Sequence, residues 1–272
     1  MKQENLDLIL NYARNFLGYG NLNAPFWFVG MEEAGVQNPD QAVGRAQVWN
    51  RLGNGHTVDL FDYSQQLGAV GERERCFIEN PYLDPRRWFR EHRPPTQPTW
   101  RPLIRFLMAV ENQSHRNDGT DIENVRTYQR NNWGRVKSNN CLLEIFGLPQ
   151  AASGSWAYAD VPRIATRKLG ITETFKQRSQ ALQGALRRGM NNGTLKIVLF
   201  YGGVNKIKNW SEVCGITNWS PATLLGGKGE FLWSRLGPAL FLGIAHPARG
   251  KIGGIQAANF VDARAEWVVR NG

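Results

Sequence analysis

Short apolar runs that end at glycine or a polar turn alternate along this chain with segments whose apolar residues recur at helical spacing. Four to six apolar residues closed by glycine are typical of a buried strand that ends in a tight turn. This pattern predicts strands over residues 25–29, 142–146, 195–201 and 239–245.

Apolar residues spaced three and four apart predict helices between these strands. The most regular helix covers 100–110, where one stripe contains Leu103, Phe106, Leu107 and Val110. Further helices are predicted over 3–17, 41–52, 172–190 and 257–269. Strands that alternate with helices indicate βαβ units. We therefore expect an α/β fold with three layers, α/β/α, around a central, mostly parallel sheet.

Two segments, 53–98 and 112–138, have no clear periodicity, and the first contains five prolines. Long segments without secondary structure in a compact domain are usually functional or mobile. We expect a single domain over 1–272, with insertions at about 53–98 and 112–138. The first insertion is expected to lie over one face, near the functional site.

The chain has a formal net charge of +10, which favours a polyanionic partner such as DNA. Cys76, Cys141 and Cys214 are too scattered for a disulfide framework or a metal site. The N-terminus lacks a signal-peptide pattern, and no apolar run approaches ~18 residues. We expect a cytoplasmic monomer without membrane contact, cofactor, metal or iron–sulfur cluster.

Two loops after predicted strands contain the candidate chemistry. Residues 30–35 place Glu32 and Glu33 after a buried strand, where parallel sheets open into a crevice. Residues 246–251 place a His, an Arg and a Lys after the last predicted strand. An acidic loop beside a basic one suits a reaction that needs a water activator opposite a cationic stabiliser. The alternative is that both loops are simply solvated turns.

The two loops together resemble the uracil-DNA glycosylase superfamily. Its first motif has the form Gly-x-Asp/Asn-Pro, and here residues 30–34 read Gly-Met-Glu-Glu-Ala. Its second motif is of the His-Pro-Ser type, and here residues 246–248 read His-Pro-Ala. The resemblance implies a monofunctional DNA glycosylase, which flips a base out of DNA and hydrolyses its N-glycosidic bond.

The resemblance assigns catalytic roles to Glu32, Glu33 and His246. Glu32 stands where an Asp or Asn orients the attacking water, and a carboxylate also stabilises a cationic sugar. Glu33 replaces the usual Pro, and its alternative is a supporting or solvated acid. Ala34 replaces a Tyr or Gly and leaves room for a bulky group at C5 of the base. His246 stands where the motif His donates to a base carbonyl; its alternative is a turn-capping His.

A Leu-Pro turn in many members follows the strand whose Asn pairs with the flipped pyrimidine. Matching this turn to residues 148–149 places Glu144 near that position, with Asn139 and Asn140 upstream as alternatives. A carboxylate accepts from the N4 amine of cytosine, whereas Asn suits uracil. Glu144 in an apolar strand is costly unless it is functional or partnered by a nearby Arg.

Basic residues after two strands are candidates for contacts with DNA phosphates. They are Arg249, Lys251, Lys206 and Lys208. Their alternative is a solvated basic surface, which also applies to the predicted helix at 172–190.

We therefore expect excision of a bulky 5-modified cytosine, such as glucosylated hydroxymethylcytosine in phage DNA, as an anti-phage defence. The first alternative is uracil excision in DNA repair. The second is an inactive DNA-binding module, which the altered first motif and Ala248 would allow.

Overall fold

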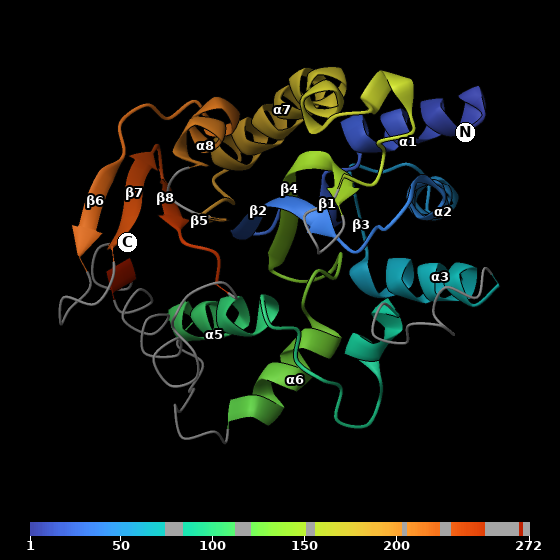
Figure 1. Cartoon of the computed structure of the whole chain (residues 1–272). Coiled ribbons are helices and arrows are strands. Elements are labelled where there is room, and N and C mark those ends of the chain that lie inside the picture. The colour runs from blue at the N-terminus through green and yellow to red at the C-terminus, as the bar shows by residue number, and fades with distance from the viewer. Residues whose placement is uncertain are drawn as a thin grey trace.

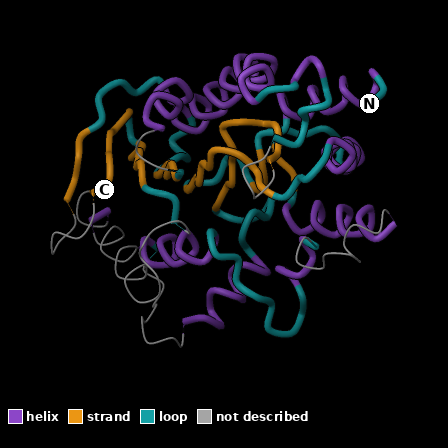
Figure 2. The backbone as a smooth tube through the Cα atoms, in the orientation of Figure 1, coloured by secondary structure: helices purple, strands orange, loops and turns teal. Residues whose placement is uncertain are grey.

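An eight-stranded sheet lies between two layers of helices in the computed structural model (Figures 1 and 2). The structure describes residues 1–73, 84–111, 121–150, 156–202, 206–223, 230–247 and 267–268. Side chains at 33, 34, 71–73, 121, 223 and 230 lie outside that description. The strand order is β3-β1-β4-β2-β5-β8-β7-β6.

The four central strands run parallel to one another. They are β4 (Asn140–Gln150), β2 (Phe26–Ala34), β5 (Ile197–Tyr201) and β8 (Ala239–Ile244). Every residue of β5 and β8 is buried, as expected for parallel strands that are covered on both faces. This confirms the predicted three-layer α/β/α fold with a central, mostly parallel sheet.

Short strands complete the two edges of the sheet and include antiparallel pairs that the sequence pattern did not reveal. On one edge lie β1 (Gly18–Gly20) and β3 (Thr57–Val58). On the other edge lie β6 (Ser220–Thr223) and β7 (Glu230–Leu236).

The helices divide between the two faces of the sheet (Figure 1). One face is covered by α3 (Leu60–Arg73), α5 (Trp100–Val110), α6 (Asp121–Asn131) and the 3-10 helix η2 (Pro85–Phe89). The other is covered by α7 (Arg167–Asn191) and α8 (Ile207–Cys214). Helices α1 (Gln3–Asn15) and α2 (Pro39–Arg51) pack against each other beside the sheet, near the 3-10 helix η3 (Pro162–Ile164).

Most predicted elements are present, with shifted ends. Helix α5 has the predicted bounds, α1 starts as predicted and ends two residues earlier, and α2 differs by one or two residues at each end. Helix α7 begins at Arg167 rather than at 172, because the Thr166 side chain accepts from the Leu169 amide and caps an earlier turn. The predicted helix over 257–269 lies outside the described residues, except for 267–268, which are helical.

The described parts of 53–98 and 112–138, in which the sequence showed no clear periodicity, include helices that contribute to the core. Leu60, Tyr63 and Leu67 of α3 are buried in the core between the sheet and this helix layer. Tyr128 of α6 and the following Trp133 are buried in the same core. Their apolar residues have helical spacing, but intervening polar residues and the prolines of the first segment obscured it.

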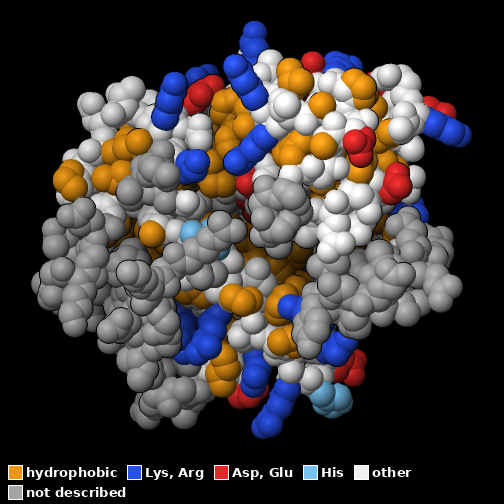
Figure 3. Space-filling model, in the orientation of Figure 1, with side chains coloured by type: hydrophobic (Ala, Val, Ile, Leu, Met, Phe, Trp, Pro, Cys, Tyr) orange, Lys and Arg blue, Asp and Glu red, His pale blue; other side chains and the backbone are white. Residues whose placement is uncertain are grey.

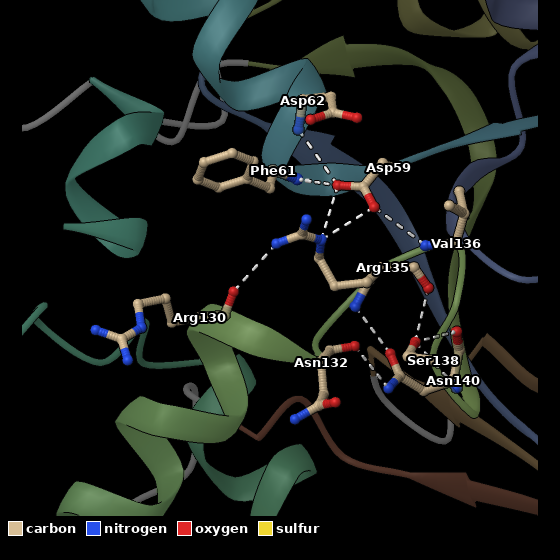
Figure 4. Close-up of polar contacts among 10 residues, drawn as sticks. Asp59, Phe61, Asp62, Arg130, Asn132, Arg135, Val136, Ser138 and Asn140 are labelled. Carbon is tan, nitrogen blue, oxygen red and sulfur yellow. Dashed lines mark hydrogen bonds and ion pairs between the residues drawn. The ribbon is translucent and has the colours of Figure 1, made fainter. Parts of the chain in front are cut away.

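Asp59 joins the start of α3 to the chain that follows α6 (Figure 4). Its Oδ1 accepts from the amides of Phe61 and Asp62 at 3.0 and 3.3 Å, which caps the helix. Its Oδ2 accepts from Nε of Arg135 and from the amide of Val136, at 3.0 and 3.2 Å. All of these partners belong to the scaffold, so this polar cluster has a structural role.

Arg178 of α7 joins three elements through one guanidinium group. Only 1% of its surface is exposed, and it donates to backbone carbonyls of two segments. These are Ala13, Phe16 and Leu17 at the end of α1, and Glu144 and Ile145 in β4. The last carbonyls of a helix lack intrahelical donors, and β4 continues past the end of its short neighbour β1. Arg178 therefore joins the end of α1 to β4 through hydrogen bonds to both.

We predict that Arg178→Met lowers the free energy of unfolding by at least about 3 kcal/mol, because it leaves several buried carbonyls without donors. Urea denaturation measures this change. Arg187→Met is the matched control, because Arg187 lies on the same helix and is exposed. Equal stability of the two variants would contradict a structural role for Arg178.

Candidate functional site at the carboxyl ends of the parallel strands

Three residues lie in a row across adjacent strands, at the middle of β4 and β2 and at the carboxyl end of β5. The register pairs Glu144 of β4 with Gly30 of β2. It pairs Val29 of β2 with Phe200 of β5, so the next residues, Gly30 and Tyr201, are also neighbours. Because adjacent strands lie about 4.8 Å apart, Glu144 and Tyr201 face each other across the glycine.

The glycine in the middle of this row makes room for both flanking side chains. A Cβ atom at Gly30 would collide with the Glu144 carboxylate and would lie 2.8 Å from the Tyr201 hydroxyl. Gly30 does not have a positive φ, so the site requires its small size rather than its backbone freedom. Oε2 of Glu144 is buried there. The carboxylate and the hydroxyl thus meet over the backbone of β2.

Tyr201 links Glu144 to His246. The Tyr201 and His246 rings make an edge-to-face contact, with centroids 6.1 Å apart and planes at 72°. Burial and the nearby Glu144 carboxylate raise the pKa of the Tyr201 hydroxyl well above its usual value. His246 is half-buried and lies just past the end of β8. Two residues predicted from separate motifs are therefore neighbours of the same tyrosine.

Glu32 lies farther along β2 and is held by an arginine from the opposite helix layer. Nη2 of Arg167 donates to Oε2 of Glu32 at 2.7 Å, and the Glu32 side chain is 22% exposed. The Arg167 guanidinium also lies over the Phe146 ring, 5.8 Å from its centroid. A cation in the first turn of α7 is disfavoured by the helix dipole, and Glu32 offsets this cost. The ion pair fixes the direction of the carboxylate.

The sequence pattern missed Tyr201 and Arg167. Tyr201 is the last residue of the apolar run at 195–201, so it was counted only as part of a strand. Arg167 precedes the predicted start of its helix. The pairing of parallel strands, which was predicted, was the signal that could have pointed to Tyr201.

The structure describes only some of the remaining predicted site residues. The backbone of Glu33 and Ala34 belongs to β2, where the register with β4 shifts and Ala34 lies opposite Gln150. Lys206 and Lys208 lie at the start of α8, which packs on the other face of the sheet from Tyr201. Arg249 and Lys251, like the side chains of Glu33 and Ala34, lie outside the described part of the chain.

Asn140 does not join the row, and the structure gives it a supporting role instead (Figure 4). It is fully buried at the opposite end of β4. Its Oδ1 accepts from the Gly134 amide at 2.8 Å, and its Nδ2 donates to the carbonyl of Asn132 at 3.1 Å. It thereby holds the turn after α6. Asn139 beside it bonds to Tyr128 and Glu111, also away from the row.

The face shown in Figure 3 is hollowed near its centre, between the two helix layers, with hydrophobic side chains on the floor and Lys and Arg side chains around it. Among the described residues, no cluster of His, Cys, Asp and Glu is arranged to hold a metal ion. None of the described helices is both long enough and apolar enough to cross a membrane.

Comparisons with protein-family models, with curated proteins and with solved structures found no match for this chain. The function is therefore inferred from the chemistry of the site and from its two loop motifs.

We predict that Gly30→Ala destabilises the protein by ~1–3 kcal/mol, because the added methyl overpacks the space that Glu144 and Tyr201 fill. Gly184→Ala is the control, because its added Cβ would meet only a side-chain nitrogen at 3.5 Å. The control should gain about 0.5–1 kcal/mol from the better helix propensity of alanine. Urea denaturation of both variants tests this, and an unchanged Gly30→Ala protein would contradict the crowded arrangement.

Proposed function

We propose that this protein is a DNA glycosylase that excises a bulky 5-modified cytosine, with a fold of the uracil-DNA glycosylase type. The observation that supports this most is the meeting of Glu144 and His246 on either side of Tyr201, with Glu32 two residues beyond Gly30 in β2. A base reader, a base-side donor and a water-orienting carboxylate are the groups that glycosidic hydrolysis needs.

The proposed reaction divides the charge of the transition state between two groups. The bond between C1′ of the sugar and the ring nitrogen of the base breaks, and its electron pair leaves with the base. His246 donates a hydrogen bond to the base carbonyl as this negative charge builds. Glu32, held by Arg167, orients the water that adds to C1′ and accepts its proton. The base leaves as an anion and takes up a proton from solvent, and the hydroxyl from the water remains on C1′ of the abasic site.

Substrate choice is proposed to depend on Glu144. An ionised carboxylate only accepts hydrogen bonds, so it suits the N4 amine of cytosine and opposes the O4 carbonyl of uracil. Sites that are built on buried hydrogen bonds reject analogues that cannot make them. The small residue at Ala34 is proposed to leave space in which a sugar at C5 is held, and contacts with that sugar would select the modified base over unmodified cytosine. Excision from phage DNA would act as a defence.

The net charge of +10 supports DNA as the partner. Basic side chains that neutralise DNA phosphates contribute binding affinity that does not depend on the base sequence. Lys206 and Lys208 flank the end of β5 and are candidates for such contacts, as are Arg249 and Lys251.

The deciding experiment incubates the protein with three DNAs, which contain glucosylated hydroxymethylcytosine, uracil or only standard bases. Abasic sites are then detected by alkaline cleavage. The proposal expects cleavage of the glucosylated DNA alone. Cleavage of the uracil DNA alone would support a repair enzyme. DNA binding without any excision would indicate a binding module.

We predict that Glu144→Asn shifts preference toward uracil, because an amide can donate to O4 where a carboxylate cannot. The ratio of excision rates on the two modified DNAs should change by roughly 10-fold or more, the scale of 1–3 kcal/mol for one base contact. Glu173→Gln is a control for loss of a carboxylate, because Glu173 pairs with arginines on the outer surface of α7. A ratio that is unchanged in Glu144→Asn would remove Glu144 from base recognition.

We predict that His246→Ala slows excision by ~10²–10³-fold, the usual effect of losing one donor to a developing negative charge. DNA affinity should stay within a few-fold of wild type, as measured by fluorescence anisotropy. His92→Ala is the control, because His92 is exposed and distant in sequence from both motifs. Full activity in His246→Ala would reduce His246 to a turn residue.

A further inference from the structure

We propose that Tyr201 is a second base-reading residue, whose hydroxyl acts together with the Glu144 carboxylate on the hydrogen-bonding edge of a cytosine. This inference rests on the proposed function and adds a specificity determinant to it.

The geometry behind this proposal is the row across β4, β2 and β5. Glu144 and Tyr201 extend from the two strands that flank Gly30, and both of their polar ends approach the position that a Gly30 Cβ would occupy. Because the carboxylate and the hydroxyl lie close together, a bound base could form hydrogen bonds with both of them rather than with Glu144 alone. The same tyrosine contacts His246, so this pair lies beside the proposed base-side donor.

The chemistry of the two groups matches a cytosine edge. Cytosine presents the N4 amine as a donor next to the N3 acceptor, whereas uracil presents the reverse order at these positions. Glu144 accepts from N4, and the Tyr201 hydroxyl donates to N3. A tyrosine phenol keeps its proton at neutral pH, and burial beside Glu144 raises the pKa of Tyr201 further, so the hydroxyl can donate.

This arrangement also explains why β2 has a glycine at its centre. Any side chain at Gly30 would separate the carboxylate from the hydroxyl, and an alanine methyl already collides with both. A strand that served only as scaffold would gain stability from a larger residue there, because glycine is unfavourable in strand interiors. The glycine is consistent with a requirement for two converging polar groups.

The test is Tyr201→Phe, which removes the hydroxyl and keeps the ring against His246. Excision of the glucosylated cytosine should fall roughly 10- to 100-fold, the effect of leaving one buried base acceptor unpaired. The ratio of glucosylated-cytosine to uracil excision should fall with it, whereas affinity for unmodified DNA should not change. Tyr63→Phe is the control, because it removes another buried tyrosine hydroxyl, one that donates to the Arg45 carbonyl within the scaffold.

A double-mutant cycle separates base reading from general disruption of the site. Glu144→Gln is the second change, because it replaces the carboxylate with an amide of the same shape. If both residues read one base edge, the double variant should lose clearly less activity than the product of the two single losses. Multiplicative losses, or a Tyr201→Phe variant with wild-type rate and wild-type base ratio, would overturn the proposal.

The wild-type assay distinguishes this failure from failure of the proposed function. An active wild type with an unaffected Tyr201→Phe variant would reject only the role of Tyr201. A wild type that excises neither modified base would reject the glycosylase proposal and this inference together. Thermal melting of each variant confirms that it is folded before rates are compared.

Discussion

The guanidinium of Arg178 fixes the part of the sheet on which the candidate site depends. Carbonyls at the end of α1 and in the part of β4 beyond β1 lie close enough to share one donor group. A single buried side chain from α7 donates to both, and two of its acceptors are the carbonyls of Glu144 and Ile145. The backbone of the proposed base reader is therefore held by α7, from the face of the sheet opposite to Tyr201.

The features that sequence could predict are those set by local pattern. Apolar runs that end at glycine or at a polar turn predicted the four parallel strands, and a regular stripe of apolar residues predicted α5. Parallel strands expose their carboxyl ends at one edge of the sheet, so Glu144 and His246 could be expected near each other although their motifs are far apart. The structure brings both to Tyr201. Their roles in base excision remain proposals.

The features that sequence could not predict depend on contacts between distant elements. Asn140 and Glu144 lie on one face of the same strand, and only the turn that binds Asn140 shows that it serves the scaffold. Arg167 and Glu32 meet because α7 starts earlier than its pattern suggested. Residues 53–98 contain the core helix α3, whose apolar residues are separated by polar ones. The sequence signal for this helix is therefore weak, and its packing against the sheet favours the helical conformation.

The alternation of side chains along a strand separates two tasks within β5. Phe200 stacks on Trp210 of α8, with ring centroids 5.8 Å apart, whereas the next residue, Tyr201, faces Glu144 across Gly30 on the opposite side of the sheet. Substitutions in the row can therefore alter which chemical groups the site recognises while the packing under α7 and α8 is preserved. Under the proposed function, substitutions in this row would change the target base while the core on the far side of the sheet keeps its packing.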